Sequence, residues 1–217
     1  MLTTAQALQQ FATDYSKAVA NETGYLPQVC HDNEWTSPCE HEGALDGEKI
    51  QWQPQLTEHA SQYNGFANIE HALELSIHQD IKDYYHSLYS GSLFGTFDSR
   101  QFELLQIWNE QDIDRLSTNI IGHIMMQQKL KQSLTVFIGC VVNSEKMLSI
   151  DNTTGQVVCE IAGNNDREVL ASSICDFLSR LSPLASPEEE QVYQAPQPLK
   201  AGLMPRLKEV MRSLLGR

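Results

Sequence analysis

Apolar positions recur at helical spacing over about five turns in the middle of the chain. They predict one long central helix over about 110–130. Asn109 precedes it as an acceptor for free backbone N–H groups, and Glu110 and Asp112 stand at the positive end of the helix dipole. The residues of its apolar face are Ile113, Leu116, Ile120, Ile121, Ile124 and Met125.

Two apolar runs flank this helix and are typical of strands. The first spans 102–108, and the second, 134–142, is rich in β-branched residues and has no charge. If these strands are neighbours in one sheet, the helix between them predicts parallel pairing with a right-handed crossover.

The remaining periodic segments complete an α+β fold with a mixed, mainly antiparallel sheet. The sequence from Thr3 resembles a capping box before an amphipathic helix, and Gly24 stands where that helix should end. Further helices are expected over 68–77, over 80–88 and from about 166 until Pro183. Strands are expected at 93–97, 147–150 and 156–161, the last two joined as a hairpin.

Residues 25–49 have no periodicity and read as a long loop with a net charge of −5. A short edge strand, stopped by Pro54, follows it. The loop carries two thiols and two imidazoles that suit zinc, but their spacing does not match that of zinc sites, so we expect no metal. The four residues are Cys30, His31, Cys39 and His41.

Charge divides the chain into three parts. Residues 1–182 hold 24 acidic against 10 basic residues, and 183–198 form a linker with four prolines. Residues 199–217 form a basic amphipathic segment with a net charge of +4. This tail could fold back on the acidic body, remain free, or contact a membrane or partner; we favour the last. Its candidate contact residues are Arg206, Lys208 and Arg212.

The overall balance of 28 acidic to 15 basic residues argues against nucleic-acid binding and suits a basic protein partner. We expect a cytoplasmic protein, because no secretory signal opens the sequence and no apolar run approaches about 20 residues. The odd count of five cysteines fits reduced thiols in that compartment.

The sequence contains none of three common catalytic motifs, so it gives little support for an enzyme. The chain lacks a phosphate-binding loop, a nucleophile elbow and a His-Glu-x-x-His zinc helix. His123, at the margin of the apolar face of the central helix, is expected to be a packed, hydrogen-bonded residue rather than a base. We therefore expect no enzyme, no cofactor and no small-molecule substrate.

Several stretches, taken in order, resemble the Syd family, bacterial proteins that interact with the translocation-channel subunit SecY. The resemblance spans about 4–183, and no single stretch is specific by itself. The stretches are Ser37-Pro-Cys39, Trp52-Gln-Pro54, Glu70-x-Ala72-Leu73-Glu74, Leu104-Leu-Gln-x-Trp108-x-Glu110-x-Asp112, Asn119-x-x-Gly-His123, Thr135-x-Phe-Ile138, Leu170-Ala171 and Phe177-Leu178-x-x-Leu181.

The resemblance implies a Smi1/Knr4-like fold whose acidic concave surface binds the basic cytosolic loops of SecY. It thereby implies a peripheral position on the cytosolic face of the bacterial inner membrane and a role in monitoring translocase assembly. The acids at matching positions are Glu70, Glu74, Glu110 and Asp112; weaker candidates are Glu34, Glu40 and Glu42, with Trp35, Trp52 and Trp108 as aromatic anchors. Glu110 and Asp112 could instead only serve their own helix, Trp108 could belong to the core, and the tail extends past the usual end of the family.

A second function from a different class remains open. Related folds serve as immunity-like proteins that neutralise toxins, and an acidic body would suit a basic toxin. The genomic neighbourhood distinguishes the two, because an immunity protein is encoded beside its toxin.

Overall fold

The computed structural model describes residues 2–57 and 65–187. The linker beyond Pro187 and the basic tail predicted for 199–217 lie outside these residues. The helices are α1 (Thr4–Thr23), α2 (Gly65–Leu73), α3 (Gln79–His86), α4 (Glu110–Lys129) and α5 (Ile174–Arg180). The strands are β1 (Gln28–Cys30), β2 (Lys49–Gln51), β3 (Gln55–Leu56), β4 (Leu88–Tyr89), β5 (Leu93–Phe97), β6 (Arg100–Leu104), β7 (Thr135–Val141), β8 (Met147–Asp151), β9 (Val157–Glu160), β10 (Arg167–Ala171) and β11 (Ser182–Pro183).

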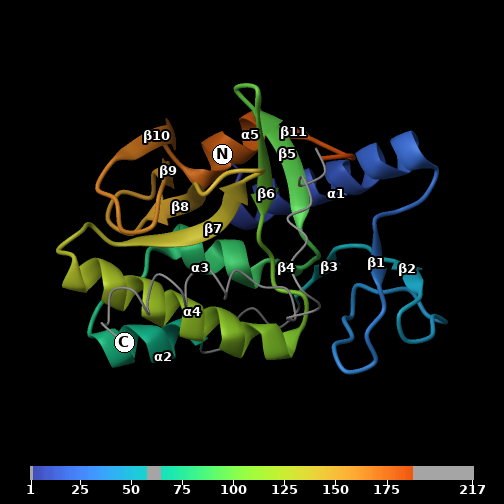
Figure 1. Cartoon of the computed structure of the whole chain (residues 1–217), viewed down its shortest axis with the longest axis horizontal. Helices are drawn as coiled ribbons and strands as arrows, with labels where there is room; N and C mark the ends of the chain where they lie inside the picture. Colours follow the sequence, from blue (N-terminus) through green and yellow to red (C-terminus); the bar gives the residue numbers. More distant parts are fainter. Residues whose placement is uncertain (1, 58–64, 188–217) are drawn as a thin grey trace.

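One curled sheet of seven strands dominates the structure, in the order β10-β9-β8-β7-β6-β5-β11 (Figure 1). Every pairing within it is antiparallel. Two small two-stranded sheets, β1-β2 and β3-β4, lie outside it. The predicted α+β class, the mainly antiparallel sheet and the long helix α4 are confirmed.

The expectation of a parallel crossover between β6 and β7 is wrong. These strands are antiparallel neighbours, with Leu104 opposite Gly139. The segment after β6 explains the difference: Ile107 forms a bridge with Tyr89 and accepts a hydrogen bond from the Ser90 N–H at 3.0 Å. The chain thus leaves the sheet before α4 begins, and β7 enters the sheet at the end where β6 left it.

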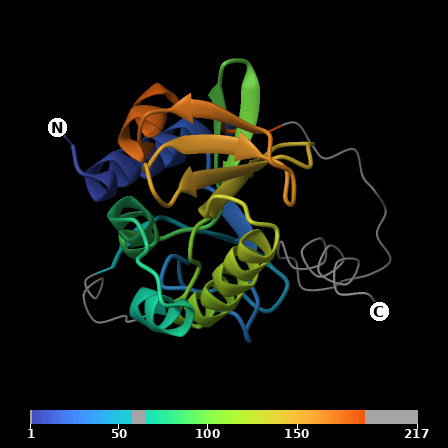
Figure 2. The same ribbon diagram turned by 90° about the vertical axis from the view of Figure 1, so that its left-hand side faces the viewer.

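The helices pack around the curled sheet in two groups. Helix α1 contacts α5 and the β5–β11 end of the sheet, while α4 contacts β7 and α2 (Figures 1 and 2). Helix α1 also contacts α3, so the two groups meet. The capping box predicted at Thr3 is present, and Gly24 ends α1 in the left-handed conformation.

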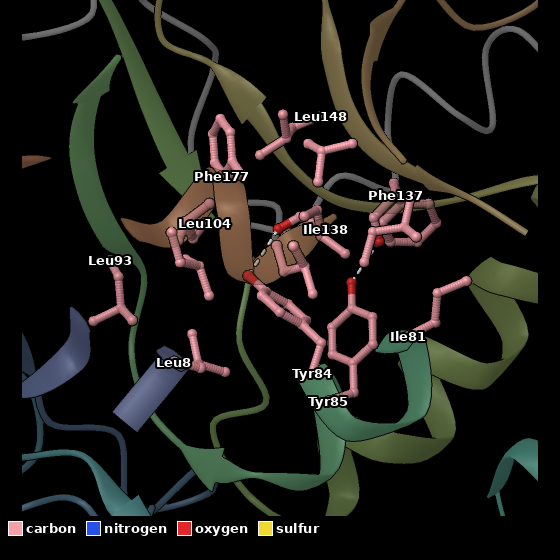
Figure 3. Packing of buried hydrophobic residues seen from close by; sticks show 14 of the residues in the cluster. Leu8, Ile81, Tyr84, Tyr85, Leu93, Leu104, Phe137, Ile138, Leu148 and Phe177 are labelled. Atoms are coloured by element: carbon pink, nitrogen blue, oxygen red, sulfur yellow. Dashed lines mark hydrogen bonds between the residues drawn. The ribbon is translucent and has the colours of Figure 1, made fainter. Parts of the chain in front are cut away.

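The core lies between the sheet and these helices, and two tyrosines connect the layers (Figure 3). Tyr84 and Tyr85 of α3 are fully buried. Their hydroxyls donate to the carbonyl oxygens of Ile138 and Phe137 in β7, at 3.2 and 2.6 Å. Because a buried hydroxyl needs a partner, these bonds fix the position of α3 over β7.

Three further sequence-based expectations need correction. The helix expected over 68–77 is α2, which begins earlier and ends earlier, at Gly65 and Leu73. The helix predicted from 166 begins only at Ile174, because 167–171 form strand β10 against β9. Ser173 supplies the N-cap, accepting from the Asp176 N–H. The loop predicted over 25–49 contains strand β1, which pairs with β2; the short strand expected after residue 49 is confirmed as β2.

No helix among the described residues is both long enough and apolar enough to cross a membrane.

Candidate functional site

The acidic loop meets the start of α4 through three hydrogen bonds. The Trp108 Nε1–H donates to the Trp35 carbonyl at 3.2 Å, and Asn109 Nδ2 donates to the Thr36 carbonyl at 2.8 Å. In the opposite direction, Ser37 Oγ donates to the Trp108 carbonyl at 2.5 Å. These bonds join two segments that lie about 70 positions apart in the chain. We call the resulting surface the loop–helix junction (35–37 with 108–109).

Aromatic rings support this junction from the core. Trp52 packs edge-on against Trp108, with ring centroids 5.9 Å apart, and stacks on Tyr15 at 6.4 Å. Trp52 is only 4% exposed, so its indole is a core residue and offers no surface to a partner. Trp35 is half-buried, and the Arg115 guanidinium lies over its ring at 4.8 Å from the centroid.

The N-terminus of α4 is capped by its own side chains. Asn109 Oδ1 accepts from the Asp112 N–H at 3.0 Å, and Asp112 Oδ2 accepts from the Trp108 N–H at 3.1 Å. Asp112 also lies 3.5 Å from Arg115. Its carboxylate therefore serves the helix and the junction, whereas Glu110 is exposed.

An open hollow of about 320 Å³ lies at the junction, and we call it the acidic hollow. It brings together two of the acids named from the sequence: Glu34 from the loop and Glu110 from the first turn of α4. The lining residues include no basic side chain. They are Glu34, Thr36, Pro38, Tyr89, Asn109, Glu110 and Gln111.

Tyr89 responds to the charge of this hollow. Burial raises the pKa of its hydroxyl, and the negative charge of Glu110 and the Cys39 thiol raise it further. Burial also raises the pKa of the Cys39 thiol, because this residue of the acidic loop is only 1% exposed. Tyr89 therefore stays protonated around neutral pH and lines the hollow together with Glu110.

The other acids named from the sequence lie elsewhere, and two are engaged within the chain. Glu70 of α2 is 2.6 Å from Lys82 Nζ and accepts from the Ile77 N–H at 2.8 Å. Burial acts to raise the pKa of Glu70, but these two donors outweigh it and lower the pKa. Glu40 is nearly buried and lies 3.0 Å from His31 Nδ1. Glu42 and Glu74 are exposed, outside the hollow.

Among the four predicted zinc candidates, His31 makes two side-chain contacts within the acidic loop. His31 contacts Glu40 through Nδ1 and Asn33 through Nε2, at 3.0 and 3.1 Å. Cys30 is exposed and Cys39 buried. Within 2–57 and 65–187, no group of three or more His, Cys, Asp or Glu residues is arranged to hold a metal ion.

His123 is packed and hydrogen-bonded, as expected. It is 1% exposed, and its Nε2 lies 3.3 Å from Thr135 Oγ1 and 2.9 Å from Gln127 Nε2. Thr135 Oγ1 donates in turn to Glu160 at 2.6 Å, and Glu160 pairs with Arg167 at 2.7 Å. This buried network joins α4 to β7, β9 and β10.

Tyr89 and Thr36 are site residues that sequence reasoning missed. Tyr89 belongs to a two-residue strand, and Thr36 lies in an aperiodic loop, so neither stands out in the hydrophobic pattern. The signal available was the sequence Trp-Thr-Ser-Pro at 35–38, a run of hydrogen-bonding and turn residues between acids.

Comparison with known families matches residues 5–183 to the family described as Syd protein (SUKH-2). The chain is 37% identical over 186 residues to "Protein Syd" of Colwellia psychrerythraea, covering 83% of this chain and 92% of that protein. It is 38% identical over 217 residues to "Protein Syd" of a Shewanella species (strain ANA-3), covering 97% of each chain. It is 36% identical over 183 residues to "Protein Syd" of Alteromonas mediterranea, covering 84% of this chain and 98% of that protein.

The Shewanella alignment covers nearly the whole chain, so it extends well beyond residue 183. Residues beyond 183 therefore have aligned counterparts in that relative. With a family match over most of its length and relatives of more than one genus above 30% identity, the chain belongs to the Syd protein family.

Proposed function

We propose that the protein is a non-enzymatic binding protein that docks its acidic hollow onto basic cytosolic loops of SecY and so monitors or restrains assembly of the translocation channel. The observation that carries this proposal is the hollow itself. Two carboxylates from segments distant in sequence, Glu34 and Glu110, share one concave surface whose lining has no basic side chain. Such a surface favours a cationic partner.

The rigidity of the surface supports a docking role. The loop that carries Glu34 is held to α4 by the three hydrogen bonds of the junction, and His31 pairs with Glu40 within the same loop. A preformed surface loses less conformational entropy on binding than a mobile loop would. Exposed Glu42 and Glu74 add negative charge outside the hollow, where they would steer a basic partner over a longer distance.

A flotation experiment with membrane vesicles tests the proposal. Full-length protein is mixed with vesicles that contain or lack SecY, over a series of salt concentrations. We expect SecY-dependent flotation that weakens steeply as salt rises, because exposed charges are screened beyond about 8 Å at physiological ionic strength. The docking mechanism would be overturned if binding did not change with salt concentration, or if the protein floated equally with vesicles that contain and vesicles that lack SecY.

The basic tail over 199–217 is proposed as a second contact, with the membrane or with the partner. Arg206, Lys208 and Arg212 would contribute about 1 kcal/mol each near an anionic surface. Deleting 188–217 should reduce flotation with SecY-free anionic vesicles and should weaken, without abolishing, the SecY-dependent part. Unchanged flotation of the truncated protein with anionic vesicles would remove the membrane role.

A further inference from the structure

We propose that His31 is a pH-sensitive switch of the acidic loop. Its doubly protonated ring holds residues 31–48 in the ordered form, and loss of one proton loosens them. We call the group the His31 cluster (His31 with Asn33 and Glu40). The inference concerns regulation of the proposed docking surface, so its relevance to SecY rests on the proposed function.

Both ring nitrogens of His31 face oxygen atoms. Nδ1 lies 3.0 Å from Glu40 Oε2, and Nε2 lies 3.1 Å from Asn33 Oδ1. A carboxylate oxygen and an amide oxygen only accept hydrogen bonds, and a neutral imidazole donates from one nitrogen alone. Both contacts are therefore hydrogen bonds only when both nitrogens carry a proton, which makes the ring a cation.

Burial makes the charge of this ring important. The side chains of His31 and Glu40 are 12% and 7% exposed, so little water reaches the Glu40 carboxylate. Removing a carboxylate from water costs free energy unless an opposite charge and hydrogen-bond donors accompany it. The doubly protonated ring supplies both. After loss of a proton the ring keeps a single donor, so one of its two contacts breaks and Glu40 loses its counter-charge.

The main chain of His31 closes the same segment of the loop. Its N–H donates to the Glu48 carbonyl at 2.8 Å, and its carbonyl accepts from the Gly47 N–H at 2.8 Å. The two ends of the segment 31–48 therefore meet at one residue. Because 35–37 of the loop–helix junction lie within this segment, the state of the His31 ring bears on the shape of the docking surface.

The charges of the surrounding loop favour the cationic ring. Beside Glu40, the carboxylates of the segment that accept from backbone N–H groups are Asp32, Asp46 and Glu48. Lys49 of β2 opposes them; it pairs in register with Cys30, whose exposed thiol precedes His31 in the sequence. Since an opposite charge favours the charged form of a titratable group, the excess of carboxylates supports protonation of the ring.

The order of the loop should therefore fall as pH rises. The ordered form binds the extra proton, so its stabilisation is present at low pH and is lost as the ring deprotonates. Amide hydrogen exchange of the full-length protein measures this at Gly47, as protection relative to an unstructured chain. We expect about threefold or more greater protection at about pH 6 than at about pH 8, with no such change at Leu105 in the sheet.

Equal protection at the two pH values would overturn the inference. Greater protection at the higher pH would also overturn it, because that is the result for a neutral ring that accepts a hydrogen bond from an Asn33 amide turned the other way. Nitrogen-15 chemical shifts of the His31 ring provide a second measurement on the unaltered protein. Both ring nitrogens should carry a proton at about pH 6.

Variants identify the group responsible. His31→Gln keeps a polar side chain without a titratable ring and should make the protection of Gly47 independent of pH. Glu40→Gln removes the counter-charge and should weaken the pH dependence. His41→Gln, at an exposed position of the same loop, is the matched control and should keep the native pH dependence. Native pH dependence in the His31 variant would contradict the switch.

This inference and the proposed function fail separately, because protection of Gly47 is measured without a partner. If protection depends on pH as expected but SecY-containing vesicles do not bind, the switch stands and the partner is wrong. If those vesicles bind while protection does not change with pH, the docking surface stands and the switch is wrong.

Discussion

At the level of single residues, Asp112 and Glu110 have different tasks although they are two positions apart. Asp112 accepts from the Trp108 N–H and pairs with Arg115, so neutralising it removes a cap as well as a charge. Glu110 is exposed at the hollow. Loss of binding in a Glu110 variant can therefore be read as loss of charge, whereas an Asp112 variant mixes stability with binding.

Asn109→Ala should lower the free energy of unfolding by about 1–2 kcal/mol, because it removes the N-cap of α4. The substitution also removes the bond from Nδ2 to the Thr36 carbonyl, so the loop loses one of its ties to the helix. Urea denaturation measures the change. Thr3→Ala, which removes the N-cap of α1 away from the junction, is the matched control. It should cost similar stability and leave partner binding intact; equal loss of binding in both variants would contradict the role of the junction.

The buried ring of His123 should make stability depend on pH. Burial lowers its pKa to about 4, with the Arg167 charge adding to the effect and Glu160 opposing it. In the unfolded chain the pKa is about 6.5, so the unfolded state binds the extra proton between these values. The free energy of unfolding should therefore fall as pH drops from about 6.5 to about 4.

His123→Gln should flatten this fall when unfolding by urea is compared at several pH values between about 4 and 6.5. Part of the slope should remain, because burial also lowers the pKa of His86. His41→Gln, at an exposed position, is the control. A slope in the His123 variant equal to that of the native protein would contradict the assignment.

At the level of elements, two glycines of adjoining segments should respond in opposite ways to alanine. A Cβ at Gly139 of β7 would lie 2.1 Å from the Glu103 carbonyl oxygen of the paired strand. A Cβ at Gly122, inside α4, would meet nothing within 4 Å. Gly139→Ala should cost about 1–3 kcal/mol or more through forced backbone movement, and Gly122→Ala should gain about 0.5–1 kcal/mol. Thermal unfolding of both variants measures this; destabilisation by Gly122→Ala would mean that the glycine has another task.

Local sequence signals predicted most elements and the β8–β9 hairpin, but they gave the wrong direction for the β6–β7 pairing. The caps of α1 and α4 depend on neighbouring residues, and these two helices and the strand at 93–97 were placed correctly. The β6–β7 direction was missed because the contacts of Ile107 with Tyr89 and Ser90 lead the chain out of the sheet. For 166–173, helical spacing of Leu170 and Ile174 arose across a strand and a following helix.

The candidate site was only partly predictable, because local sequence does not show which distant residues come into contact. The family resemblance named Glu110 as a candidate, and the acidic loop supplied Glu34 as a weaker one. Their meeting depends on hydrogen bonds between residues about 70 positions apart. Trp52 shows the converse: an aromatic residue in a short predicted edge strand is a plausible surface anchor until its contacts with Tyr15 and Trp108 place it in the core.

At the level of the whole molecule, charge is divided between two parts of one chain. The acidic body bears a net charge of −14 over 1–182, and the last 19 residues bear +4. A partner surface that presents basic loops above an anionic membrane would match both parts at once. Tethering two weak contacts raises the effective concentration of the second, so both together should bind more tightly than either alone.

The most direct test of the central claim is the affinity of the full-length protein for SecY in lipid nanodiscs after the hollow has been neutralised. The Glu34→Gln/Glu110→Gln double variant is compared with Glu145→Gln/Asp166→Asn, which removes the same charge from exposed acids elsewhere. Docking through the acidic hollow predicts that the first variant loses about tenfold or more in affinity and much of its salt dependence, while the second binds nearly as the native protein does. Equal affinities of the two variants would contradict it.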